Sequence, residues 1–149
     1  EIAGRQHSSV IMGWARRLKL AYGDDETPWC GLFVAHCISA TLPTEPLPAN
    51  PLGARNWLKF GRPLPTPALG AILVFWRGSK AGWSGHVGFY AGERTDAFRV
   101  LGGNQSNAVT ETWLARDRLL GIRWPTSVDV PASGRVAVSA AGSLSHNEA

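Results

Sequence analysis

Apolar residues in the first part of the chain recur at helical spacing. Between residues 8 and 20, four apolar side chains share one helical face, with basic residues between them: Val10, Ile11, Trp14 and Leu18. Residues 29–40 are apolar nearly all round, which is typical of a helix buried on every side. After a proline-rich loop, a shorter helical piece is expected at residues 54–60.

The pattern changes after Gly70, where short continuous apolar runs replace the helical period. Four such runs predict strands: residues 71–76, 86–91, 98–101 and 121–124. Helices that precede strands in this way predict an α+β domain, with the helices packed on a small, mostly antiparallel β-sheet.

A single domain accounts for most of the 149 residues. We assign it to residues 1–126 and expect residues 127–149, rich in Ala, Ser and Gly, to form a weakly ordered tail or linker. No apolar run approaches the roughly 20 residues of a membrane span, which predicts a soluble protein without membrane insertion. No signal peptide is recognisable, and a chain that begins with Glu1 leaves the export route open.

The formal net charge of +4 comes from scattered lysines and arginines. The longest basic run, at residues 16–19, fits the solvated face of a helix better than a nucleic-acid site, so no nucleic-acid partner is expected. A mildly basic surface favours encounter with an anionic polymer such as the bacterial cell wall. The seven tryptophans supply packing units and, where exposed, stacking surfaces.

Cys30 stands where a polar loop turns into the second predicted helix. Unpaired amides and the positive dipole end of a first helical turn favour a thiolate, so the position predicts a lowered thiol pKa and a nucleophile. The simpler interpretation is a small buried hydrophobe in a core helix. Cys37 follows about 10.5 Å further along the helix axis, too far for a disulfide. Two cysteines at this spacing do not match a zinc site either.

His86 is the candidate base, because it begins a predicted strand between glycines that permit close approach of another group. A histidine without a role in that strand is the alternative. If the strands at 86–91 and 98–103 pair as a symmetric hairpin, Tyr90 faces Val100 and His86 faces Asn104. Asn104 could then accept a hydrogen bond from the imidazole and fix its tautomer. An ordinary turn residue is the alternative for Asn104. The fallback orienting residues are Asp117 and Glu111.

Five separated strings resemble a bacterial and phage family of cell-wall hydrolases. They are residues 26–34 (ETPWCGLFV), 74–78 (VFWRG), 85–90 (GHVGFY), 101–107 (LGGNQSN) and 119–125 (LLGIRWP). That family belongs to the papain-like NlpC and CHAP superfamily of peptidoglycan amidases and endopeptidases, and the strings occur in the family's order over about residues 1–125. The resemblance implies a papain-like NlpC/CHAP fold with Cys30 as nucleophile, His86 as base and Asn104 as the orienting residue.

Two positions depart from the family's pattern. An acidic residue is common where Ala71 stands, and alanine is common where Gly31 follows the cysteine. Neither departure removes a catalytic group, but both change the packing beside the site. The third catalytic position varies in residue type within the family.

The resemblance implies hydrolysis of an amide bond in the stem peptide of peptidoglycan, by an endopeptidase or amidase, and a cysteine nucleophile implies a thioester acyl-enzyme. No metal or organic cofactor is implied. The candidate substrate-binding residues are Glu26, Trp29, Trp83 and Tyr90, with a plain loop or core role as the alternative for each.

Two other classes of function stay open. The same Cys-His-Asn triad would serve a thiol transpeptidase, an acyltransferase or a protein-cleaving peptidase. A non-catalytic cell-wall-binding or phage structural module is the third possibility. A hydrolase would act at the bacterial cell wall, in the periplasm or outside the cell, as an endolysin, an antibacterial toxin or a housekeeping enzyme. A toxin would imply an inhibitory immunity protein as partner, and a phage or secreted enzyme a larger assembly.

Overall fold

The three predicted helices lie within a few residues of their expected positions, and a fourth, the short 3-10 helix at Arg116–Arg118, was not predicted. The computed structural model describes residues 1–2, 6–139 and 141–148. Its helices are α1 (Ser9–Arg17), α2 (Cys30–Thr41) and the 3-10 helices η1 (Ala54–Lys59) and η2 (Arg116–Arg118). No helix in this described part of the chain is both long and apolar enough to cross a bilayer.

Helices α1 and α2 differ in how they are buried. Ser8 caps α1, because its side-chain oxygen accepts a hydrogen bond from the backbone N–H of Ile11. Ile11 and Ala15 face the core, whereas Val10 is 59% exposed, so its predicted place on the buried face was wrong. Helix α2 is buried along most of its length, in line with its apolar sequence.

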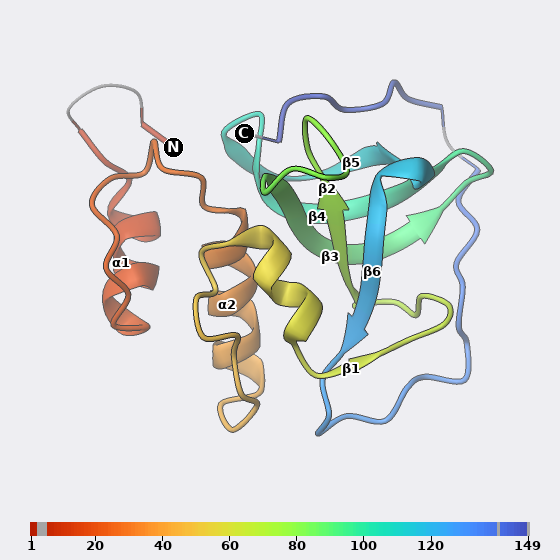
Figure 1. The fold of residues 1–149 in the computed structure, drawn as a ribbon, viewed down its shortest axis with the longest axis horizontal. Helices are drawn as coiled ribbons and strands as arrows, with labels where there is room; N and C mark the ends of the chain where they lie inside the picture. Colours follow the sequence, from red (N-terminus) through yellow and green to blue (C-terminus); the bar gives the residue numbers. More distant parts are fainter. Residues whose placement is uncertain (3–5, 140, 149) are drawn as a thin grey trace.

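Six strands form one antiparallel sheet: β1 (Arg62–Pro63), β2 (Ile72–Trp76), β3 (Gly85–Glu93), β4 (Ala97–Gln105), β5 (Ala108–Ala115) and β6 (Leu119–Trp124). Their order across the sheet is β1-β6-β2-β3-β4-β5 (Figure 1). The predicted α+β class is confirmed. Strands β1 and β5 were not predicted, because β1 is very short and the first half of β5 mixes apolar with polar residues and is largely exposed.

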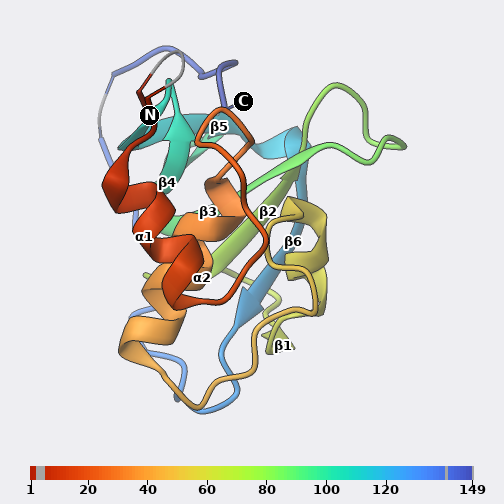
Figure 2. The same ribbon diagram turned by 90° about the vertical axis from the view of Figure 1, so that its left-hand side faces the viewer.

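Each face of the sheet supports its own apolar cluster. The helices pack against the face that carries Ile72, Val74 and Val87. Figure 2 shows α1 and α2 in front of that face. The opposite face carries a second cluster that includes Leu73, Phe75, Tyr90, Val100 and Leu114. The alternation of side chains along β2 and β3 assigns neighbouring residues to opposite clusters.

The segment after β6 runs along the side of the sheet that faces away from the helices (Figure 1). Val128 and Val136 pack against the second cluster there. Ala137 forms a parallel bridge with Glu93, and Leu144 forms one with Trp113. Residues 127–149 were expected to be a weakly ordered tail or linker. In the structure the described part of this segment is extended and hydrogen-bonded to the sheet.

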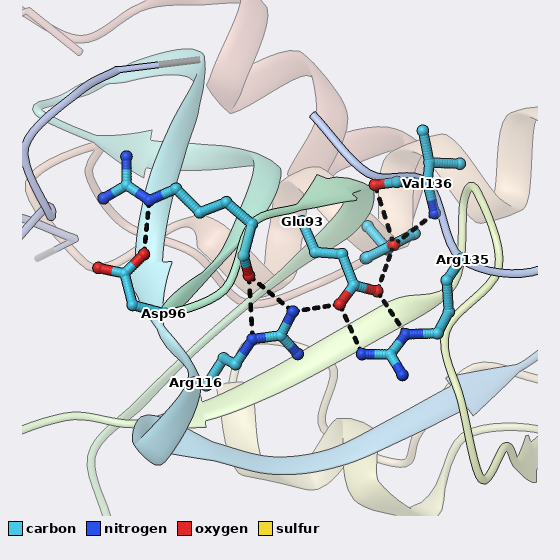
Figure 3. Close-up of polar contacts among 7 residues, drawn as sticks. Glu93, Asp96, Arg116, Arg135 and Val136 are labelled. Atoms are coloured by element: carbon cyan, nitrogen blue, oxygen red, sulfur yellow. Dashed lines mark hydrogen bonds and ion pairs between the residues drawn. The ribbon is translucent and has the colours of Figure 1, made fainter. Parts of the chain in front are cut away.

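A charged cluster fastens this segment to the sheet. The carboxylate of Glu93 accepts hydrogen bonds from the guanidinium groups of Arg116 and Arg135 and from the Tyr90 hydroxyl (Figure 3). The Tyr90 oxygen in turn accepts from the backbone N–H of Val136 at 2.8 Å. The hydrogen bonds from Arg135, opposed by burial and reinforced by Arg116, lower the pKa of Glu93 to about 2. The carboxylate therefore stays ionised at neutral pH.

Candidate active site

Cys30 is the first residue of α2 and lines a cavity of about 410 Å³. Its side chain is only 2% exposed. A side chain at Gly31 would collide with the loop that follows α2, because an added Cβ would lie 2.1 Å from the carbonyl oxygen of Pro51. Glycine at position 31 therefore allows the loop at Pro51 to pack against the start of α2. The remaining cavity walls are Thr27, Pro28, Leu52, Gly53, Ala54, Arg55, Asn56, Arg77, Trp83, Ser84 and Gly85.

Burial dominates the chemistry of the Cys30 thiol. Removal from water raises the pKa of Cys30, and the backbone N–H groups of Val87 and Gly31, which favour the thiolate, offset only part of this effect. The lowered pKa predicted from the helix start is therefore wrong for this structure. The helix-start amides do act on the sulfur, but the cost of burying its charge is larger.

His86 lies near the start of β3, opposite Phe75 of β2, and is fully buried. The next residue, Val87, is the one whose N–H approaches the Cys30 sulfur. Burial lowers the pKa of His86 to about 4, despite a hydrogen bond with Gln105 that raises it. The imidazole is therefore neutral at neutral pH.

The side-chain amide of Gln105 fixes the tautomer of His86. The amide nitrogen of Gln105 donates to the backbone oxygen of Thr110 at 2.6 Å and to that of Val100 at 3.3 Å. Because both partners are acceptors, the Gln105 Oε1 atom faces His86, whose Nε2 lies 3.0 Å away. Nε2 must then carry the ring proton. The other ring nitrogen, Nδ1, has a free lone pair and no hydrogen-bond partner among the described residues.

Gln105, and not Asn104, is therefore the residue that the structure brings to His86. The predicted hairpin register is correct at Tyr90, which lies opposite Val100, but a shift between Tyr90 and Gly92 moves the pairing by one residue toward the turn, where Gly92 lies opposite Arg99. The β4–β5 ladder is irregular between Gly102 and Gln105, and Asn104 adopts a left-handed conformation with φ of 59°. This irregularity ends the alternation before it reaches Asn104. Asn104 is itself buried, and its Oδ1 has no partner among the described residues.

The four candidate substrate-binding residues have different environments. Trp83 is 90% exposed and lines the cavity beside Cys30. Trp29 and Tyr90 are each 1% exposed, and neither is among the residues that line the cavity. Glu26 is exposed and lies outside the cavity lining.

The fallback orienting residues do not contact His86. Asp117 lies in η2, where its backbone oxygen accepts from the Trp76 indole, and Glu111 pairs with Arg99 on the exposed side of β5.

Arg55 holds the loop that carries Trp83. Its guanidinium donates to the backbone oxygens of Ser79, Lys80 and Ser84 at distances of 2.8 to 2.9 Å. The loop between β2 and β3 is thus fixed at the cavity rim. Trp83, one of the candidate substrate-binding residues, is thereby presented to solvent as a flat apolar surface.

Within the described residues, no group of three or more His, Cys, Asp or Glu side chains is arranged to hold a metal ion. Comparisons with models of protein families, with curated proteins and with solved structures found no match to this chain. Of the predicted catalytic residues, the structure brings the imidazole of His86 to the amide of Gln105, whereas the Cys30 thiol lies on the other face of the sheet and His86 is not among the residues that line its cavity.

Proposed function

We propose that the protein is a cysteine hydrolase of the papain-like type that cleaves an amide bond in the stem peptide of peptidoglycan. The observation that carries the proposal is the state of His86. Its Nε2 is tied to Gln105, its Nδ1 lone pair is available, and the following N–H approaches the Cys30 sulfur. A neutral imidazole oriented by a fixed third group is what a thiol nucleophile requires of its base.

The reaction begins from neutral groups. As the Cys30 sulfur attacks the amide carbon, its proton passes to Nδ1 of His86, and backbone N–H groups at the start of α2 stabilise the oxyanion. His86 then protonates the leaving amine, and the C–N bond breaks to leave a thioester on Cys30. Water, deprotonated by His86, attacks the thioester and releases the acid and the thiol.

This sequence requires the thiol and Nδ1 to come into contact when substrate binds. In the structure Cys30 belongs to the cluster on the helix-bearing face of the sheet, whereas His86 lies opposite Phe75 and therefore on the other face, and Nδ1 has no hydrogen-bond partner among the described residues. The proposed reaction therefore requires the start of β3 to turn the imidazole toward the thiol. Substrate that fills the cavity would also exclude water and strengthen the interaction between the developing charges.

The substrate class rests on three features. The five strings that resemble cell-wall hydrolases include the residues around both Cys30 and His86. The net charge of +4 favours approach to an anionic polymer. Trp83 at the cavity rim offers a stacking surface of the kind that binds sugar rings or peptide planes.

Digestion of purified sacculi by the wild-type chain, with mass spectrometry of the released fragments, tests the proposal. Wild type should release new fragments with free peptide termini, and Cys30→Ala should release none. Cys37→Ala is the matched control, because Cys37 lies on the same helix but is absent from the cavity lining. Equal fragment patterns from wild type and Cys30→Ala would refute the proposal.

A further inference from the structure

A second site, built around Arg118, adjoins the Cys30 cavity, and Arg77 lines both. Arg118, the last residue of η2, holds both carboxylate oxygens of Glu148, with Nη1–Oε1 at 3.2 Å and Nη2–Oε2 at 2.9 Å. Arg118 is 9% exposed and Glu148 is 1% exposed. A guanidinium that meets a carboxylate through two parallel hydrogen bonds is the geometry by which proteins recognise carboxylate groups.

Arg118 is positioned by the sheet and not only by its carboxylate partner. Its Nε donates to the backbone oxygen of Trp76 at 3.1 Å, and its guanidinium lies 5.9 Å from the centre of a Trp76 ring. These contacts do not involve Glu148. The site would therefore keep its shape if another carboxylate replaced the one present.

The sheet places this site beside His86. Leu119, which follows Arg118, pairs with Phe75, and Phe75 pairs on its other side with His86. The charges of Glu148 and Arg118 act on the pKa of His86 in opposite directions, which reflects this proximity.

Arg77 links the two sites. It lines the cavity next to Cys30, and its Nη1 donates to the backbone oxygen of Glu148 at 3.1 Å. A hollow of about 450 Å³ surrounds the Arg118–Glu148 pair and shares Arg77 with the Cys30 cavity. A ligand could thus span from Cys30 to Arg118 along Arg77.

Glu148 reaches Arg118 from an extended segment held mainly by backbone contacts. Ser145 donates its N–H to the Trp113 oxygen at 2.8 Å, and the Asn147 oxygen accepts from Ser106 at 2.9 Å. The segment thus lies on the protein as an extended peptide does, with its one buried carboxylate in the arginine site. Few apolar side chains hold it, so a competing peptide has little packing to displace.

We propose that Arg118 forms a carboxylate-binding subsite, which Glu148 occupies in this structure and a carboxylate of a bound peptide occupies in its place, while Arg77 donates to a backbone oxygen of the bound segment. The ligand class is a peptide with a free carboxylate near the bond presented to Cys30. That it is a substrate rests on the proposed function, whereas the existence of the subsite does not.

Binding of glutarate to the full chain tests the subsite without catalysis. In a Cys30→Ala background, glutarate is titrated while the indole N–H signal of Trp76 is followed by NMR. Replacement of Glu148 by Gln weakens the internal competitor, so Glu148→Gln should bind glutarate at least about tenfold more tightly. The matched control is Asp129→Asn, which removes one negative charge from an exposed position of the same segment and should leave the affinity unchanged. Glutaramide, which has the same shape without charge, should not bind.

Arg118→Gln should abolish glutarate binding, and Arg118→Lys, which keeps the charge without the paired donors, should give an intermediate affinity. Equal affinities in the parent and in Glu148→Gln would overturn the proposal and leave the ion pair as a structural fastening only. Retained binding in Arg118→Gln would overturn it as well. If Arg118→Gln does not fold, the comparison of Glu148→Gln with its parent still decides. The titration uses an inactive protein, so its result is independent of whether wild type digests sacculi.

Discussion

The Oε1 atom of Gln105 lies 3.0 Å from Nε2 of His86, and both side chains are buried. The opposite end of the Gln105 amide is committed to backbone oxygens, so the amide cannot turn over without losing those bonds. The pair therefore holds the imidazole in one tautomer. In the papain-like mechanism that we propose, this tautomer is the one that leaves Nδ1 ready to take a proton.

Gln105→Ala should lower kcat/KM at least about tenfold, because the imidazole loses the group that orients it. The acid limb of the pH profile should also move to lower pH. The hydrogen bond from His86 to Gln105 raises the pKa of His86, so its loss lowers that pKa further. Peptide-release assays across the acid range measure both effects.

Asn104→Gly is the control for that variant, since glycine accepts the left-handed backbone of position 104 without strain. It should keep kcat/KM within a few-fold of wild type and leave the pH profile in place. The reverse result, with Asn104→Gly inactive and Gln105→Ala active, would return the orienting role to Asn104.

Gly102→Ala should disturb the hydrogen-bonded pair of His86 and Gln105. A Cβ at this position would lie 2.5 Å from Oε1 of Gln105 and 3.0 Å from Nε2 of His86. We expect a loss of about 1–3 kcal/mol in the free energy of unfolding, measured by urea denaturation, together with reduced activity. Gly23→Ala is the control, because its Cβ would meet nothing within 4 Å, and it should change stability by about 0.5 kcal/mol or less. Similar free energies of unfolding for the two variants would mean that His86 and Gln105 can move apart without destabilising the protein.

Much of the fold is readable from local patterns. Helix α1 follows from the 3.6-residue period, α2 from a stretch that is apolar nearly all round, and the central strands from short apolar runs. The Tyr90–Val100 pairing follows from hairpin symmetry. Strand β5 is an edge strand whose largely exposed first half carries no such run. Its composition alone does not distinguish it from a loop.

The candidate site was harder to predict, because it depends on burial and on one irregular residue. Cys30 was identified from its place at a helix start, but its pKa is decided by the packing of distant segments around it. A left-handed Asn104 turns the end of β4 so that the neighbouring amide meets His86. The only sequence signal for Gln105 is that it is the second amide in a glycine-rich string.

Trp83→Ala should weaken substrate binding without loss of stability. The side chain is 90% exposed at the cavity rim, so its removal costs little packing. We expect KM on solubilised peptidoglycan to rise several-fold with kcat nearly unchanged. Trp57→Ala, at a fully buried tryptophan, should instead cost about 3–5 kcal/mol of unfolding free energy. An unchanged KM in Trp83→Ala would exclude the rim tryptophan from substrate binding.

His86 should make the protein sensitive to mild acid. Burial lowers the pKa of His86 from 6.5 to about 4 in the folded protein. Between these two values the unfolded chain takes up a proton that the folded protein does not, so the free energy of unfolding falls as the pH falls from 6.5 to about 4. The slope from this one group is at most about 1.4 kcal/mol per pH unit. His86→Gln removes the titration while an amide at position 86 can still hydrogen-bond to Gln105, so the variant should lose less stability over the same interval. Urea denaturation at several pH values compares the unfolding free energies of the two proteins. If both fall equally between pH 6.5 and about 4, titration of His86 is not the cause of the acid sensitivity.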